Sequence, residues 1–197
     1  MNGCPVTYRV DEEGRILAVG QAWDDFARAN QAPGLTAREV IGRSIWDAMS
    51  DPTTREIYRR LVDRVHEGVP PVRFTFRCDA PARRRLLQMT ITAGPDGTTD
   101  FETLPISCVD RGPVALLDVA APRSGELLRM CSWCKRIPLD GDWVEVEEAA
   151  RRSAIFHGGV PPAITHGICP ACEALVFGLS EAPHPAEATV AMFGAYP

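Results

Sequence analysis

The sequence predicts an α+β fold, in which a five-stranded antiparallel sheet with helices on one face precedes a small cysteine-containing module. Residues of alternating polarity form two short strands near the N-terminus and three more after a block of helices. Two separated β segments of this kind can join in one sheet with the helices packed on it. Two Cys-x-x-C pairs in the last third of the chain predict the second part.

The first two strands, at residues 8–10 and 16–19, form a predicted hairpin. Gly14 lies in the polar turn between them, where a positive φ is expected. Trp23 and Phe26 follow at helical spacing, so the chain begins with two strands and then turns to helices.

The clearest helix begins after Asp51, a good N-cap residue that is followed by Pro52 at the first helical position. Apolar side chains recur at helical spacing from Ile57 to Leu61. Gly68 fits the position just past the end of the helix, where left-handed backbone is common. We therefore expect one long helix with an apolar stripe.

Three strands follow this helix. Residues 72–77 and 87–92 alternate between apolar and polar side chains, as half-buried strands do. A turn is predicted at residues 94–97, where proline presets φ and glycine accepts a positive φ. The third strand, at residues 99–109, alternates poorly, and Pro105 within it predicts an edge, a bulge or a break.

The composition divides the chain into four parts. They are the α+β domain at residues 1–110, a connector at 111–126, a metal-binding module at 127–178 and a flexible tail at 179–197. Glycine and proline punctuate the connector, and the tail is rich in alanine and proline. We expect Leu116 and Leu117 of the connector to pack on the first domain in one state and to loosen from it in another.

Four cysteines in two Cys-x-x-C pairs predict a metal centre. They are Cys131, Cys134, Cys169 and Cys172, and 34 residues separate the two pairs. Two such pairs can close a tetrahedron of thiolates around Zn²⁺, as in a zinc-ribbon-like module. Four thiolates leave no position for water, so the predicted zinc is structural rather than catalytic. Iron in a rubredoxin-like site would use the same ligands, and the ligand set alone does not separate the two metals.

Two other interpretations bear on this region. A Cys-x-x-C pair can be a thioredoxin-like redox pair, but that chemistry needs one motif within a βαβ unit, and this sequence has two motifs without one. His166 lies three residues before Cys169 and could replace a cysteine as a ligand. We expect it instead beside the metal ligands, where it packs or donates a hydrogen bond.

The charge pattern disfavours nucleic acid as a partner. The net charge is −5 and Lys135 is the only lysine, whereas a nucleic-acid binder usually presents a basic face. The one dense basic run, at residues 83–85, is typical of a solvated strand end. No apolar run reaches the roughly 18 residues of a membrane span, and the N-terminus lacks a secretory signal. We therefore expect a cytoplasmic protein without a membrane partner.

The cysteine segments closely resemble a C-terminal motif of bacterial PAS-domain signalling proteins. The similarity lies in residues 129–137, which read RMCSWCKRI, and in residues 165–172, which read THGICPAC. In the N-terminal part, residues 11–16 resemble the opening hairpin of a PAS domain and residues 40–44 its middle helices. The first domain is thus similar to a PAS domain.

This resemblance implies a sensory or interaction domain that responds to a small molecule or a partner and commonly forms homodimers. The candidate residues for a cavity between sheet and helices are Phe26, Ile45, Tyr58, Leu61, Phe74, Met89 and Ile91, each of which could instead fill a solid core. The cysteine-containing helix of flavin-binding PAS domains is absent from the sequence. Where haem-binding members carry an iron-ligating histidine, this chain has Glu56 and Ile57, so neither cofactor is predicted.

We therefore predict a non-enzymatic signalling or regulatory protein, in which a PAS module senses a small ligand or partner and a structural zinc module serves protein interaction. The sequence contains no histidine-kinase, Walker A, GGDEF, EAL or receiver sequence. The first alternative is a nucleic-acid-binding transcriptional regulator that acts through the zinc module. The second is a metalloenzyme that uses His166 and Cys169, for which no motif supplies an open metal site and a base.

Overall fold

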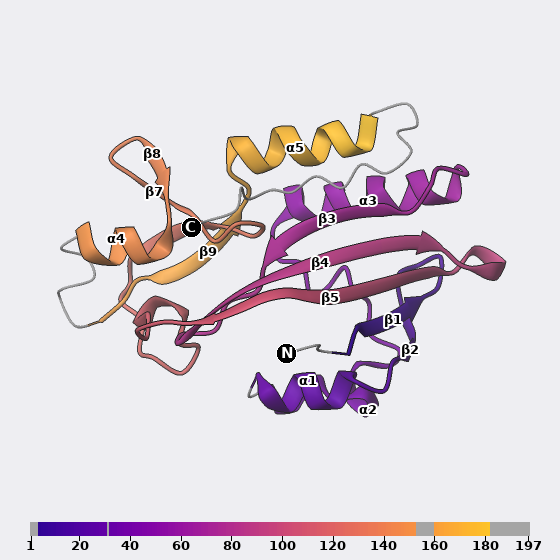
Figure 1. Cartoon of the computed structure of the whole chain (residues 1–197), viewed down its shortest axis with the longest axis horizontal. Helices are drawn as coiled ribbons and strands as arrows, with labels where there is room; N and C mark the ends of the chain where they lie inside the picture. Colours follow the sequence, from indigo (N-terminus) through magenta and orange to yellow (C-terminus); the bar gives the residue numbers. More distant parts are fainter. Residues whose placement is uncertain (1–3, 31, 153–159, 182–197) are drawn as a thin grey trace.

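The computed structural model describes residues 4–30, 32–152 and 160–181 (Figure 1). Its largest element is a five-stranded antiparallel sheet with the strand order β2-β1-β5-β4-β3. The strands are β1 (Val6–Val10), β2 (Ile16–Val19), β3 (Val72–Arg77), β4 (Arg83–Ala93) and β5 (Thr99–Asp110). The predicted fold class is confirmed, with the two N-terminal strands joined to the three later ones through the β1–β5 pair.

The helices between β2 and β3 cover one face of this sheet. They are α1 (Trp23–Ala29), the short 3₁₀ turn η1 (Pro33–Leu35), α2 (Ala37–Val40) and α3 (Pro52–His66). Figure 1 shows α1 and α2 beside β1 and β2, and α3 along β3. Leu61 of α3 belongs to the same buried cluster as Phe74 of β3 and Ile91 of β4, so the main core lies between the helices and the sheet.

The local signals of α3 and of the first hairpin act as predicted. The Asp51 carboxylate caps α3 by accepting a hydrogen bond from the Thr54 amide at 2.8 Å. Gly68, just past the helix, has a φ of +85°. Gly14 in the hairpin turn has a φ of +79°, and a Cβ there would lie 2.2 Å from Nε1 of Trp46. Both glycines therefore meet a backbone requirement.

A β-bulge interrupts β5 at Pro105, where the sequence predicts an irregularity. Leu86 of β4 pairs with Ser107, but Leu87 pairs with Pro105, so Ile106 is the extra residue. Only the first part of β5, up to Thr103, also pairs with β1. Among the described residues, the rest of β5 pairs with β4 alone, so its other edge has no strand beside it.

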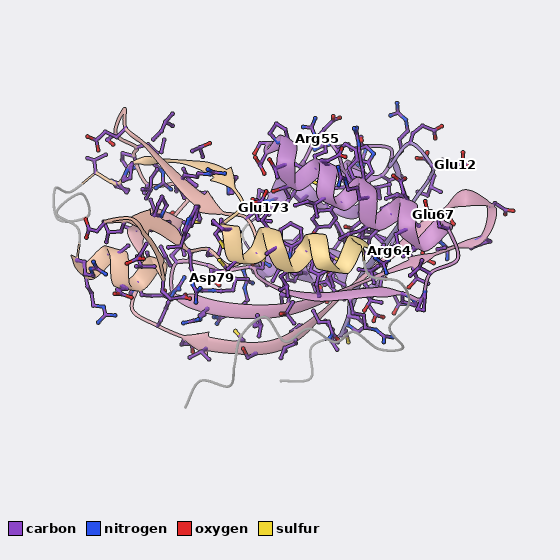
Figure 2. All side chains as sticks on the ribbon, turned by 90° about the horizontal axis from the view of Figure 1, so that it is seen from above. Glu12, Arg55, Arg64, Glu67, Asp79 and Glu173 are labelled. Carbon is purple, nitrogen blue, oxygen red and sulfur yellow. The ribbon has the colours of Figure 1, made fainter. Side chains whose placement is uncertain are left out.

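The C-terminal part builds smaller elements around the cysteines. They are β6 (Leu127–Cys131), β7 (Ile137–Leu139), β8 (Asp142–Val144), α4 (Val146–Arg152), β9 (Ala163–Gly167) and α5 (Pro170–Glu181). Strands β6 and β9 pair in parallel, and β7 and β8 form a hairpin. Seen from above, α5 runs beside α3 over the sheet, and its Val176 joins the main core (Figure 2). Within the described residues, no helix combines the length and apolarity needed to cross a membrane.

The connector does not pack as expected. Leu116, in the 3₁₀ turn η3 (Ala115–Leu117), is fully buried in a second cluster with Met130, Val146 and other module residues, and Leu117 packs against it. The expectation that both leucines contact the first domain is therefore wrong, because the turn directs them into the module. The connector instead meets the sheet domain through polar contacts, because the Val114 amide donates to Pro81 O at 3.0 Å and the Arg111 guanidinium pairs with Asp79 at 3.1 Å.

The boundaries of the four parts stay predictions. Helix α5 continues to Glu181, past the expected start of the tail at residue 179. Residues 182–197, most of the expected tail, lie outside the described residues.

Candidate metal centre

The four predicted cysteine ligands meet in one buried cluster. Their Sγ atoms all lie within 4.8 Å of one another, and none of the four residues is more than 5% exposed. The Sγ atoms of Cys134 and Cys169 are 3.7 Å apart. A tetrahedral site with Zn–S bonds of about 2.3 Å places sulfur atoms about 3.8 Å apart, so the observed spacing fits such a site. The four cysteines are thus positioned to hold a metal ion.

The backbone around each pair supports thiolate ligands. In the first pair, the Lys135 amide donates to Cys131 O at 3.0 Å, and Lys135 itself has a φ of +61° that tightens the turn. In the second pair, the Cys172 amide donates to Sγ of Cys169 at 3.5 Å. The Cys169 amide donates across the site to Sγ of Cys131 at 3.4 Å. Amide donors stabilise the charged form of a thiol, which is the form that binds metal.

The sulfur atoms also shift one another's pKa. Hydrogen bonds from Cys134, Cys169 and Cys172 lower the pKa of Cys131, because they stabilise its thiolate. The pKa of Cys134 and of Cys172 is raised, first because each holds its proton in a hydrogen bond to Cys131. The cluster alone therefore does not favour four thiolates at once. A divalent cation would supply the positive charge that four neighbouring thiolates require.

His166 is close to this centre but is not one of the clustered ligands. It lies on β9, opposite Met130 of β6, and the four-residue metal group found among the described residues does not include it. Burial lowers the pKa of His166, and the Lys135 ammonium lowers it further. The expected role of His166 beside the metal stays a prediction.

Trp133 ties the first cysteine pair to the sheet domain, and sequence reasoning missed it. It lies between the ligands Cys131 and Cys134 and is only 2% exposed. Its ring centroid lies 5.2 Å from that of Phe74 on β3 and 5.3 Å from that of Tyr58 on α3. Its position in the sequence could have indicated this role. A metal-binding turn is too small to bury a large aromatic ring, so the ring must pack against another part of the protein.

Hydrogen bonds reinforce this contact. The Arg77 amide at the end of β3 donates to Trp133 O at 2.7 Å. The Ser132 hydroxyl donates to the Thr54 hydroxyl on α3 at 3.3 Å, because the Thr54 proton is already donated to Asp51. The first cysteine pair is thus bound to both the edge strand and the long helix of the sheet domain.

A buried ion-pair network forms a second link. The Arg77 guanidinium, which is 1% exposed, binds Asp79 and reaches Glu145 and Glu147 of the module. Arg111 of the connector pairs with Asp79 at 3.1 Å and also binds Glu147. Burial alone would lower the pKa of Arg77, but the three carboxylates raise it. Figure 2 labels Asp79 where the sheet meets the module.

The seven candidate cavity residues divide into two groups. Five of them are buried in the main core and fill it, namely Ile45, Leu61, Phe74, Met89 and Ile91. Phe26 lines an apolar cavity of about 230 Å³ under α1, together with Trp23 and Leu87. Tyr58 lines a second cavity, of about 350 Å³, at the first cysteine pair.

Comparison with known proteins finds similarity among solved structures only. The chain matches no protein-family model and no curated protein. Among solved structures it is similar to the PAS domain of the RpfR quorum-sensing receptor from Cronobacter turicensis in complex with C12:0, with 17% identity and a TM-score of 0.37. That match covers 52% of this chain and 94% of the other chain.

Two further structures give similar values. The photoactive yellow protein domain of the sensor histidine kinase Ppr from Rhodospirillum centenum is 25% identical, with a TM-score of 0.36, over 51% of this chain and 90% of that one. The PAS domain of BvgS from Bordetella pertussis is 25% identical, with a TM-score of 0.35, over 51% of this chain and 71% of that one. The fold assignment rests on the strand order and helix placement of this chain itself.

Proposed function

We propose that this chain is a non-enzymatic signalling or regulatory protein, in which a PAS-like sensory domain acts through its core on a structural zinc module that binds a protein partner. Trp133 carries the proposal, because its ring packs in the core of the sheet domain while its backbone joins two metal ligands. Packed cores transmit displacements rather than absorb them. A ligand that shifts the packing around Trp133 would therefore shift the first cysteine pair.

The apolar cavity under α1 supports the sensory part of the proposal. Its walls include Trp23, Phe26 and Leu87, and its volume of about 230 Å³ suits a small apolar molecule. Phe76 on β3 lines both this cavity and the one at the cysteine pair. A molecule in the apolar cavity would thus contact a side chain that also borders the metal module.

We further propose zinc as the metal, a cytoplasmic location and a homodimer formed by the sheet domain. Zn²⁺ suits a closed four-thiolate site, and a reducing compartment keeps such thiolates available. The exposed apolar side chains Leu104, Ile106 and Val109 along β5 support a protein-binding surface there.

Neither alternative function gains support from a specific contact. In the described part of the module, Arg129 lies over the Trp143 ring at 5.8 Å and Arg136 pairs with Glu145 at 3.0 Å, so both cations already have partners in the chain. That arrangement does not favour nucleic acid. Four sulfur ligands also leave no open position for a catalytic metal.

Native mass spectrometry of protein purified from its own host tests the proposal, with Ala27→Phe as the variant. Ala27 is buried in the cavity wall, whereas Ala29 of the same helix is exposed and provides the matched control Ala29→Phe. We expect one zinc per chain in all three proteins. A small apolar molecule should be retained by the wild type and the control and lost from Ala27→Phe.

The coupling is tested separately by hydrogen exchange around the first cysteine pair. Amide exchange there should differ between ligand-bound and ligand-free wild type. Identical exchange in the two states would contradict the coupling, and protein with no retained molecule would contradict the sensory role.

A further inference from the structure

The second cavity lies where the sheet domain meets the first cysteine pair, separate from the apolar cavity under α1. Its volume is about 350 Å³, within the range of small-molecule sites. Three segments that are distant in sequence supply its walls, with Tyr58 from α3, Phe76 from β3 and both Trp133 and Lys135 from the cysteine turn. His166 of β9 completes its polar side.

Several hydrogen-bond donors in this cavity have no acceptor among the described residues. Lys135, the only lysine of the chain, donates to Ser132 O at 2.9 Å and has no carboxylate within 4.0 Å among the described residues. An ammonium can donate three hydrogen bonds, so two remain. The Tyr58 hydroxyl has no hydrogen-bond partner in the described part of the chain, and neither does the buried indole N–H of Trp133.

The carboxylates of the same cavity, in contrast, are already engaged. Asp51 accepts from both the amide and the hydroxyl of Thr54, at 2.8 and 2.7 Å. Asp79, whose side chain has no exposed surface, is held by Arg77 and Arg111. Among the described residues, Lys135 is therefore the cation of this cavity that has no carboxylate within 4.0 Å.

The walls of the cavity restrict the shape of a ligand that could pair with the Lys135 ammonium. The rings of Tyr58 and Trp133 lie 5.3 Å apart, and Phe76 adds a third aromatic face. Apolar aromatic walls combined with a cation and a hydroxyl donor match a molecule that has a small apolar body and one anionic group.

We propose that this junction cavity binds a small monocarboxylate, whose carboxylate accepts hydrogen bonds from the Lys135 ammonium and the Tyr58 hydroxyl while its apolar body lies against Trp133 and Phe76. Because the cavity bridges α3, β3 and the cysteine turn, the ligand stabilises the arrangement of the sheet domain against the metal module. The site requires neither the apolar cavity nor the proposed signalling role.

Isothermal titration of the zinc-loaded full chain with benzoate and hexanoate tests this site, with benzamide and hexanamide as neutral counterparts. At least one carboxylate should bind saturably, at least tenfold more tightly than its amide. Lys135→Met should weaken that binding at least tenfold, because it removes the ion pair and keeps the length of the side chain. Lys135→Arg should restore binding to within about threefold, and Tyr58→Phe should weaken it by about tenfold, the size expected for one hydrogen bond to a charged group.

The control is Arg83→Met, which removes an exposed cation outside the cavity and should bind like the wild type. Zinc content measured on every variant separates loss of the site from loss of the metal, and the comparison of acid with amide on the wild type needs no variant. The absence of saturable carboxylate binding up to about 10 mM would overturn the proposal, since such an affinity is below that of a specific site. Undiminished binding by Lys135→Met in the presence of a full zinc complement would overturn it as well.

Discussion

The two hydrophobic clusters of this protein do not coincide with the domain and the module that the sequence predicts. The larger one, the sheet core, contains residues of α3 and the sheet together with all four cysteines and Trp133. The smaller one, the module core, contains Leu116 of the connector with Met130, Ile137 and Val146. The metal ligands thus pack with the sheet domain that precedes them, whereas Ile137, which follows the first cysteine pair closely, packs in the module core.

This difference teaches that the metal centre closes one end of the sheet core. Within the part of the chain that the structure describes, the module core has six buried residues, which is a small basis for independent folding. A metal bound to the cysteines would organise the backbone on both sides of Trp133 and keep its ring in place against Phe74. Metal binding and the stability of the sheet domain should therefore be linked.

Truncation of Trp133 should have the largest effect on this comparison. Trp133→Ala removes a ring from the sheet core and should lower the free energy of unfolding by about 3–5 kcal/mol, the range for a buried Trp or Phe. Trp143→Ala, at a half-buried position of the module hairpin, is the matched control and should lower it much less. Urea denaturation followed by circular dichroism compares them, and equal losses would show that the sheet core does not depend on Trp133.

Removal of Arg77 should be the next largest change. Arg77→Met leaves the buried carboxylate of Asp79 with Arg111 as its remaining cation and should lower the free energy of unfolding by about 3 kcal/mol. Arg83→Met, at an exposed position of β4, should change it by less than about 0.5 kcal/mol. A loss for Arg77→Met as small as that of the control would mean that the network does not hold the two regions together.

The module core can be weakened alone through the connector. Leu116→Ala should cost about 2–3 kcal/mol, near the lower end for a buried leucine because this cluster is small. Hydrogen exchange should rise mainly in β6, β7 and α4, with β3 and β4 less affected. Equal loss of protection in the sheet would indicate one cooperative core instead of two.

The smallest effect is a pH dependence that comes from Glu147. Burial alone would raise the pKa of Glu147, but its backbone hydrogen bond and the charges of Arg77 and Arg111 lower it. The resulting stabilisation is complete above the unfolded pKa of about 4.3 and disappears as the pH falls through the lower folded value. The difference in unfolding free energy between the wild type and Glu147→Gln should thus be constant from pH 7 to about pH 5.5 and narrow below about pH 4.3. A difference that stays constant at low pH would contradict this.

The sequence predicted the features that depend on neighbouring residues. The cap of α3 by Asp51 and the hairpin turn at Gly14 are local, and the structure confirms both. At Pro105 the sequence predicted an edge, a bulge or a break, and the structure has a bulge. The meeting of the two Cys-x-x-C pairs was also predicted from the sequence, because four thiolates at this spacing suit one tetrahedral metal site.

What the sequence did not predict depends on contacts between distant segments. Arg77 lies 68 residues from Glu145, and nothing local marks them as partners. The parallel pairing of β6 with β9 joins short strands that lack a clear alternation. The prediction of where Leu116 packs was wrong for the same reason, since an apolar residue in a connector can pack on the domain before it or on the module after it.

The most direct test of the central claim is hydrogen exchange of the sheet domain with and without the metal. The protein would be compared in its zinc-loaded form and after removal of zinc by a chelator, with amides of β3 and β4 observed individually. The Trp133 ring packs on Phe74, and the Trp133 carbonyl accepts a hydrogen bond from the Arg77 amide. We therefore predict that zinc removal increases hydrogen exchange in β3 and in the part of β4 paired with it, while exchange in β1 and β2 changes least. Increased exchange confined to residues 127–178, with β3 as protected as before, would contradict the claim that the metal centre closes the sheet core.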